Sequence, residues 1–316
     1  MNTNTSSMRS PSPDYFGSHT LLRVRHETVY RYPGAASLAY NMAWLTPLND
    51  PQQNCLQHRV KIDPKPRLTE TRMDVFGNQC TYFEVHKPHD MLKVVSHAVV
   101  ERHTGTLDAI KETTWEQCRY RELGNAHQRV RSCRFAYPGP ITPALPGLAE
   151  YAQVAFVSER PIVEAIAAFT KQIFSEFSYQ TGATHVDTPI DVVWQTRKGV
   201  CQDFAHIAVS GLRSIGLIAA YVSGYIVTNP PEGEEKLQGT DASHAWYAVF
   251  IPGYGWLHSD PTNDMWVRDE HITVALGRDY SDVPPLKGVC YGGGQQHPDV
   301  AVTVERISEE DASYGD

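Results

Sequence analysis

The hydrophobic and polar positions change their pattern along the chain, and the first pattern is typical of strands. Between residues 20 and 105, apolar positions recur at every second residue in runs such as LLRVRHETVYRY, LQHRVKI and LKVVSHAVVE, as in half-buried strands. Turn-forming segments, NDPQQN, DPKPR and DVFGNQ, separate these runs. Several short strands at this spacing predict an N-terminal β-sandwich domain over residues 20–105.

The second pattern is helical. Apolar residues from Ile162 to Phe177 recur at every third or fourth position, so they predict a helix with one buried face. A similar stripe runs from Cys201 to Ile215, and Gly216 is a typical helix end. Three strand-like runs follow: IAAYVSGYIVT, HAWYAVFI and WLHSD. Because the helices precede these strands and do not alternate with them, we expect an α+β domain with helices packed on an antiparallel sheet.

The remaining segments show no clear periodicity of hydrophobic residues. Residues 1–19 are rich in Ser, Thr, Asn and Pro and predict a disordered tail. Residues 106–160 contain the proline-rich run AYPGPITPALPGL, so we expect a partly helical strap between two domains. The α+β core is then expected over residues 161–305, ending in the strand VAVTVERI, and an acidic tail over residues 306–316.

Composition excludes several classes of partner. The chain has 316 residues, of which 41% are hydrophobic and 20% charged, as in globular proteins. Its formal net charge is −8, and the basic residues do not gather in one segment, so neither nucleic acid nor an anionic membrane is an expected partner. No apolar run in the sequence approaches the length of roughly 18 residues that a membrane span needs. The first residues also lack the apolar stretch that is typical of a secretory signal. We therefore expect a cytoplasmic protein.

One of the six cysteines stands out by its position. The six are scattered without a C-x-x-C pair, which favours neither a zinc site nor a disulfide framework. Cys201 begins a predicted helix, directly after Gly199 and Val200. A helix N-terminus carries about half a positive charge and unpaired N–H groups, which favour a thiolate and can hold an oxyanion. The alternative is a small buried residue, as most free cysteines are.

The segment SHAWYAVFIPGYGWLHSDPTND holds the two further groups that a cysteine nucleophile needs. His244 on one predicted strand could act as a base, and Asp260 at the end of the next could orient its imidazole. Taken separately, His244 could be a core histidine and Asp260 a turn residue before a proline. The two side chains share a face of the hairpin only if the connecting loop has an odd number of residues, such as Pro252–Tyr254.

These segments resemble a known family. GVCQDFAHIAVSGLRSIGLIAAYVSGYI and SHAWYAVFIPGYGWLHSDPTN are similar to the catalytic core of the transglutaminase-like superfamily, in particular its bacterial cysteine-protease-like branch. Residues 21–100, with the D-x-F-G-N stretch Asp74–Asn78, resemble the N-terminal β domain of that branch, and ALGRDYSDVPPLKGVCYGGGQ resembles its C-terminal segment. The resemblance implies a papain-like core with Cys201 as nucleophile, His244 as base and Asp260 as the orienting carboxylate.

Three other residues are weaker candidates for the site. Tyr179 could line the cleft or stabilise the oxyanion, Gln202 adjoins the nucleophile, and Trp246 shares a strand face with His244. Each could also be an ordinary packing residue. No cofactor or metal ion is expected, because the sequence contains neither a glycine-rich phosphate loop nor an H-E-x-x-H motif.

The combined prediction is an α+β, papain-like or transglutaminase-like core behind an N-terminal β-sandwich, acting on a peptide or protein substrate. We expect hydrolysis of peptide or amide bonds through a thioester on Cys201. The segments near the site, QTGATHVDT, NPPEGEEKLQGTDAS and PTND, are polar, which favours water over a lysine amine as the acyl acceptor. Protein-glutamine transamidation and a non-catalytic binding or scaffold module are the alternatives, and the oligomeric state stays open.

Overall fold

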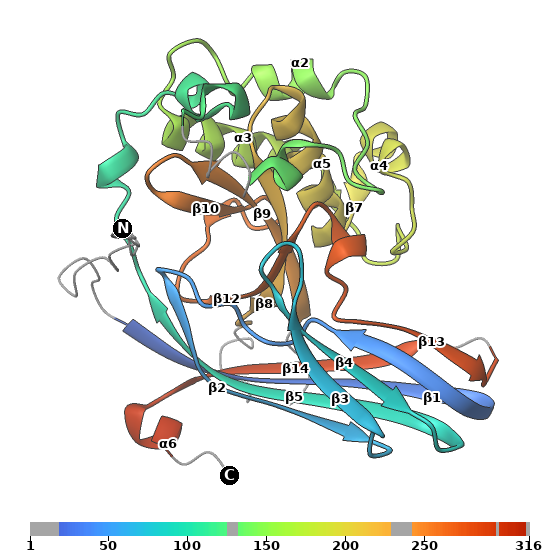
Figure 1. Ribbon diagram of the computed structural model, residues 1–316. Coiled ribbons are helices and arrows are strands. Elements are labelled where there is room, and N and C mark those ends of the chain that lie inside the picture. The colour runs from blue at the N-terminus through green and yellow to red at the C-terminus, as the bar shows by residue number, and fades with distance from the viewer. Residues whose placement is uncertain (1–18, 125–131, 229–241, 295–296, 314–316) are drawn as a thin grey trace, which may run out of the picture.

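The computed structural model of the protein has two parts, a curled β-sheet and a mixed α/β unit (Figure 1). It describes residues 19–124, 132–228, 242–294 and 297–313. The predicted disordered tail lies outside the described residues except for His19, which begins the first strand. The acidic segment NPPEGEEKLQGTD also lies outside them.

The N-terminal domain is an antiparallel sheet that bends around one long strand, β1. Within the described residues, the strands of this sheet are β1 (His19–Ala43), β2 (Gln53–Asp63), β3 (Leu68–Met73), β4 (Gln79–Val85), β5 (His89–His103), β13 (Leu286–Gly292) and β14 (Pro298–Ile307). The first half of β1 pairs with β5 and the second half with β4. Apolar residues such as Phe83, Val85 and Leu92 form a core cluster of this domain. The predicted N-terminal β domain is confirmed, but its described strands form one bent sheet where we expected the two facing sheets of a sandwich.

The C-terminal strands belong to this sheet and not to the α/β core. We predicted the run VAVTVERI as the last strand of the core, but it lies in β14, which pairs with β1 from Tyr30 opposite Pro298 to Leu21 opposite Ile307. An alternating pattern specifies a strand and its buried face but not the strand with which it pairs. The prediction therefore assigned this strand to the wrong sheet. The predicted acidic tail starts with the end of β14 and continues into a short helix, α6 (Glu309–Ser313).

Where the structure describes it, the segment between the two parts contains a series of short helices. They are η2 (Asp108–Ile110), η3 (Trp115–Cys118), η4 (Tyr120–Glu122), η5 (Cys133–Ala136) and α2 (Leu148–Gln153). The buried guanidinium of Arg213 fixes this segment to the core. It donates to the carbonyl of Phe135 at 3.0 Å and to the hydroxyl of Thr142 at 3.2 Å.

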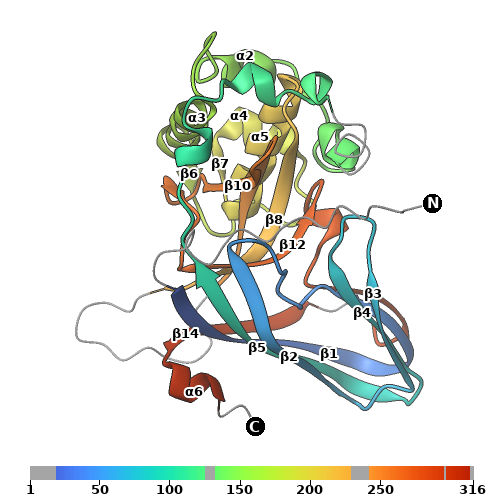
Figure 2. The ribbon, with the colours of Figure 1, turned by 60° about the vertical axis from the view of Figure 1, so that its left-hand side comes forward.

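The α/β core consists of helices packed on an antiparallel sheet of strand order β11-β10-β9-β8-β12. The elements are α3 (Ile162–Glu176), β6 (Ser178–Tyr179), α4 (Ile190–Thr196), β7 (Lys198–Gly199), α5 (Cys201–Ser214), β8 (Ala219–Ile226), β9 (Ala242–Ile251), β10 (Gly255–Asp260), β11 (Met265–Trp266), β12 (His271–Gly277) and η6 (Tyr280–Asp282). The apolar face of α5 lies on β8 and β9, and α3 lies on β10. Figure 2 shows α2, α3 and α4 on the side of the core away from the N-terminal sheet. The predicted fold class is confirmed.

None of the helices in the described part of the chain is long and apolar enough to span a bilayer.

Two amide side chains of the N-terminal domain complete the edge of the core sheet. Gln53 donates to the carbonyl of Thr273 at 2.7 Å and accepts from its N–H at 2.8 Å. Asn78, from the D-x-F-G-N stretch, makes the same pair of bonds with Leu276, each 2.8 Å long. The Asn78 amide also donates to Asp74 at 2.8 Å, which fixes its orientation. An edge strand presents unpaired backbone groups, and these amides satisfy those of β12 at two positions.

Candidate active site

Cys201 is the first residue of α5 and is half-buried. The chain reaches it along a short parallel ribbon in which Tyr179 of β6 lies beside Gly199 of β7. Val200 between this ribbon and the helix is extended. The ribbon therefore fixes the direction in which the chain enters the helix and leaves the thiol accessible from one side.

A buried carboxylate locks the first turn of this helix. Asp203 accepts hydrogen bonds from the N–H of Val200 at 2.8 Å and from the hydroxyl of Thr184 at 2.6 Å. Gly199 lies against the same carboxylate, because a Cβ on Gly199 would come within 2.5 Å of Asp203 Oδ2. The contact that orients Cys201 therefore requires a residue without a side chain at position 199.

The hairpin of β9 and β10 carries His244 and Asp260. Its register pairs Ile251 with Gly255 and leaves the three residues 252–254 as the loop. The predicted odd loop length is confirmed, so the two side chains share a face of the sheet. Gly255 has a φ of 108°, a conformation that the return of the chain requires and that glycine adopts readily.

The imidazole of His244 lies between a carboxylate and the thiol. Its Nε2 is 2.7 Å from Asp260 Oδ2, and the Cys201 side chain lies close enough to raise the pKa of the imidazole. Because Nε2 donates to the carboxylate, Nδ1 is the ring nitrogen available to the thiol. The structure thus brings together all three residues that the sequence singles out.

Hydrogen bonds determine the charge of this pair. Burial by itself lowers the pKa of His244, but hydrogen bonds to Asp260 and Cys201 outweigh burial and hold that pKa well above its ordinary value. Burial by itself raises the pKa of Asp260, and hydrogen bonds from His244 and His271 outweigh it and hold the pKa below its usual range. Both shifts favour an imidazolium next to a carboxylate. A charged imidazolium also stabilises a neighbouring thiolate.

Donors surround the fully buried carboxylate of Asp260. Its Oδ1 accepts from the N–H of Thr262 at 2.9 Å. Its Oδ2 accepts from the amide of Asn263 at 2.7 Å and from Nε2 of His271 at 3.3 Å, in addition to His244. The sequence analysis missed Asn263 and His271. The signal for His271 was a histidine at the start of the apolar run ITVAL, since a buried polar group needs a partner.

Trp246 lies beneath the catalytic histidine candidate. It is fully buried, its ring centroid is 5.8 Å from that of His244, and its Nε1 donates to Nδ1 of His258 at 3.1 Å. Gly224 on the neighbouring strand makes room for the indole, because a Cβ there would lie 2.4 Å from it. Trp246 therefore supports the imidazole by packing, and its N–H is used inside the core.

The other two weaker candidates border the exposed side of the thiol. Tyr179 is 56% exposed and contacts Phe204 edge-on, with 6.3 Å between the ring centroids. Burial and the neighbouring Cys201 raise the pKa of Tyr179, so its hydroxyl stays protonated. Gln202 donates to the carbonyl of Val186 at 3.3 Å. Neither side chain is buried, and a role of either in lining the cleft stays a prediction.

The shared oxygen of Asp260 and the Nε2 atoms of His244 and His271 lie within 4.8 Å of one another, a spacing that a metal ion could bridge. The same atoms are already joined by hydrogen bonds, and a cation would have to displace the protons of both. The hydrogen bonds account for the arrangement of these three side chains.

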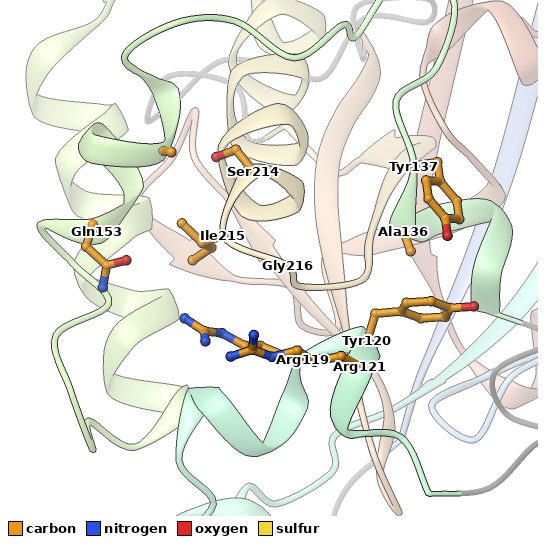
Figure 3. Close-up of a pocket in the computed structure, with 10 residues that line it drawn as sticks. Arg119, Tyr120, Arg121, Ala136, Tyr137, Gln153, Ser214, Ile215 and Gly216 are labelled. Carbon is orange, nitrogen blue, oxygen red and sulfur yellow. The ribbon is translucent and has the colours of Figure 1, made fainter.

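A pocket of about 490 Å³ lies at the end of α5 opposite to Cys201 (Figure 3). Residues of the strap and of the helix end line it, including Arg119, Arg121 and Ile215. The helix has 14 residues, so at 1.5 Å per residue the pocket is about 20 Å away from the thiol. It therefore takes no part in the arrangement around Cys201.

Comparisons with known proteins find matches to both parts of the chain. The family model of the bacterial transglutaminase-like N-terminal region matches residues 22–101, and that of the transglutaminase-like superfamily matches residues 150–261. An uncharacterized protein of Mycobacterium tuberculosis is 38% identical over 297 residues, covering 91% of this chain and 93% of that one. A protein-glutamine gamma-glutamyltransferase of Pseudomonas aeruginosa is 28% identical over 187 residues, covering 57% of this chain and 28% of that one.

A solved structure agrees at the level of the fold. A candidate cysteine protease from Cytophaga hutchinsonii superposes with a TM-score of 0.72 over 92% of each chain, at 17% sequence identity. The superfamily match includes Cys201, His244 and Asp260, and the N-terminal match coincides with the strands from β1 to β5. This chain belongs to the transglutaminase-like superfamily.

Proposed function

We propose that the protein is a cysteine-dependent hydrolase of peptide or amide bonds. The observation that carries the proposal is the contact of a half-buried thiol at a helix start with an imidazole that a buried carboxylate holds. This arrangement suits nucleophilic acyl transfer, which needs a nucleophile, a base and a group that orients the base. A relative named as a glutamyltransferase supports acyl transfer as the class of reaction.

In the first step, the thiolate of Cys201 attacks the carbonyl carbon of the substrate amide. A C–S bond forms and the carbonyl electron pair moves to oxygen. When the intermediate collapses, the C–N bond breaks and His244 donates its proton to the leaving amine. The products of this step are an amine and a thioester on Cys201.

In the second step, water attacks the thioester. His244, now neutral, accepts a proton from the water while the new C–O bond forms. The C–S bond then breaks, a carboxylic acid leaves, and the thiolate and imidazolium are restored. Asp260 stays ionised throughout and keeps Nε2 of His244 protonated and correctly oriented.

The start of α5 can stabilise the oxyanion in both steps. The first N–H groups of a helix have no partner within it, and those of Cys201 and Gln202 lie next to the reacting sulfur in the chain. The N–H of Val200 is unsuitable, because it donates to Asp203. Such donors are worth most when they are held in place before the charge develops, and Asp203 holds this turn.

Water is favoured over an amine as the acceptor because the site is open. Tyr179 is 56% exposed and Val186 is 60% exposed, whereas a dedicated transamidase must exclude water. The tryptophans that could wall a tunnel are engaged elsewhere. Trp246 is fully buried, Trp194 lies under an arginine guanidinium, and Trp256 packs on a strap phenylalanine.

The test is product analysis on a panel of peptides that contain glutamine and asparagine, by mass spectrometry. We expect cleaved or deamidated peptides with the wild type and with Cys290→Ala, a matched control that removes another half-buried thiol, but not with Cys201→Ala. With excess primary amine, hydrolysed product should exceed amine-linked product. A majority of amine-linked product would favour transamidation. The absence of any product with both the wild type and Cys201→Ala would favour a binding module.

A further inference from the structure

We infer that His271 is a positioning residue of this site, a second imidazole that holds the carboxylate of Asp260 for His244. The inference rests on the proposed function. Nε2 of His271 is 3.3 Å from Asp260 Oδ2, the oxygen that is 2.7 Å from Nε2 of His244. The side chains of His271 and Asp260 are completely buried. One carboxylate oxygen thus serves two imidazoles, of which one contacts the thiol and the other does not.

The second ring nitrogen distinguishes the two histidines. Nδ1 of His271 is buried and has no hydrogen-bond partner among the described residues. A proton there would be an unsatisfied buried donor, which is costly, whereas a proton on Nε2 is bonded to the carboxylate. Burial also lowers the pKa of His271. His271 is therefore a neutral donor through Nε2, while His244 carries the charge.

The groups that face His271 oppose a second positive charge. Besides burial, the charges of His244 and of Arg102, a buried residue of β5, lower the pKa of His271, and Asp260 acts in the opposite direction. His258 on β10 is neutral, because burial lowers its pKa to about 3, and its Nδ1 accepts the indole N–H of Trp246. The ring of Trp246 contacts His271 edge-on, with 5.2 Å between the ring centroids. These contacts fix the orientation of the His271 ring, and the surrounding charges keep it neutral.

The N-terminal domain sets the position of His271. His271 is the first residue of β12, and Gln53 holds that strand two residues later through both backbone groups of Thr273. Arg102 donates to the carbonyl of Arg268, three residues before His271, and to the Gln53 side chain, each at 3.3 Å. The histidine therefore lies between two contacts from the β domain. Through them this domain takes part in orienting the carboxylate.

The donor has a chemical consequence for His244. A carboxylate oxygen that accepts an additional N–H bond is less basic, so His271 limits the rise in the pKa of His244 that Asp260 causes. Without that donor, His244 should keep its proton to a higher pH and release it less readily to the leaving amine. The orientation matters in the transition state and not in substrate binding, so kcat should fall while KM changes little.

Two amide variants separate this role from a structural one. The amide nitrogen of Gln can occupy the place of Nε2 and reach Asp260, whereas the shorter Asn places its nitrogen near Nδ1 and cannot. We compare wild type, His271→Gln, His271→Asn and the control His206→Gln. His206 is another buried histidine, whose Nε2 accepts the N–H of Tyr280 at 3.2 Å. Alkylation of Cys201 by iodoacetamide, followed against pH by mass spectrometry, reports on the thiolate and imidazolium without any substrate.

We expect the alkaline inflection of alkylation to move up by about half a pH unit or more in His271→Asn, and to stay near that of the wild type in His271→Gln and His206→Gln. On a cleaved peptide, His271→Asn should lower kcat by about tenfold with little change in KM. Thermal melting checks the fold, and His271→Phe replaces His271→Asn if the latter does not fold. An unchanged inflection in a folded variant without the donor overturns the inference. The shifted inflection without any peptide turnover supports the role of His271 and counts against the proposed hydrolase.

Discussion

The amide of Asn78 offers a sharp test of how the two domains are joined. It makes both bonds to the backbone of Leu276, each 2.8 Å long, and it is buried, with 1% of its surface exposed. In Asn78→Ala the N–H and C=O of Leu276 lose their partner. No neighbouring strand replaces it, since β12 is the edge strand of its sheet.

The magnitude follows from the two orphaned groups. A buried backbone group left without a partner costs roughly 1–3 kcal/mol. Water that enters the vacated space recovers part of this loss, so the expected decrease in the free energy of unfolding is about 3 kcal/mol. For a chain of 316 residues, an unfolding entropy of about 2.1 cal/mol/K per residue converts this loss into a decrease in Tm of about 4 to 5 °C.

The assay is thermal unfolding of the full chain, followed by tryptophan fluorescence and by circular dichroism. Asn54→Ala is the matched control, because that exposed asparagine on β2 donates to Glu101 at 3.0 Å without crossing to the core. We expect its Tm to stay within a degree of the wild type. A Tm for Asn78→Ala equal to that of Asn54→Ala would refute the claim that these bonds hold the core sheet to the β domain.

Further predictions concern the site itself. The stability that the His244–Asp260 pair supplies should be complete between about pH 4 and 6.5, the unfolded-state pKa values, because the folded pKa of the histidine is raised and that of the carboxylate lowered. This contribution to stability should decline below about pH 4 and above about pH 6.5. The Tm difference between wild type and Asp260→Asn should therefore become smaller in both of these pH ranges. A Tm difference that does not depend on pH would contradict the prediction. Iodoacetamide at mildly acidic pH should label Cys201 ahead of the other thiols, and comparable labelling of several counts against its activation. Gly199→Ala should reduce the rate of Cys201 labelling severalfold, because the added Cβ would lie 2.5 Å from the Asp203 carboxylate. Gly34→Ala is the control and should leave the rate unchanged, because a Cβ at Gly34 has no atom within 4 Å. Equal labelling rates in the two variants would contradict the role of Asp203 in holding the helix start.

Local pattern was sufficient for the place of each of the three residues in its own element, whereas their meeting in one site was implied by the family resemblance. The stripe of apolar positions places Cys201 at a helix start, and strand alternation with an odd loop places His244 and Asp260 on one face. Both rules act over fewer than about twenty residues, where periodicity fixes which way a side chain points. The backbone thus follows from the sequence wherever neighbours in the chain are also neighbours in space.

The parts that the sequence did not predict depend on distant contacts. The partner of β14 is the first strand of the chain, and nothing in an alternating run identifies it. His271 is hydrogen-bonded to a carboxylate on another strand, and Gln53 of the other domain holds the strand that carries it. The sequence shows that residues such as His271 are polar and stand among apolar ones. It does not show which distant residues become their partners, because those contacts exist only in the complete fold.

The pairing of β13 and β14 with β1 has a consequence for how the protein is made. The α/β core lies in the chain between β5 and β13, so it is an insertion within a single sheet. On the ribosome, β1 can pair early with β4 and β5, but its opposite edge has no partner until the last strands emerge. Such an open edge readily pairs with other chains. A chain that ends before β13 should therefore aggregate during synthesis, so β13 and β14 protect the protein from aggregation in addition to completing its sheet.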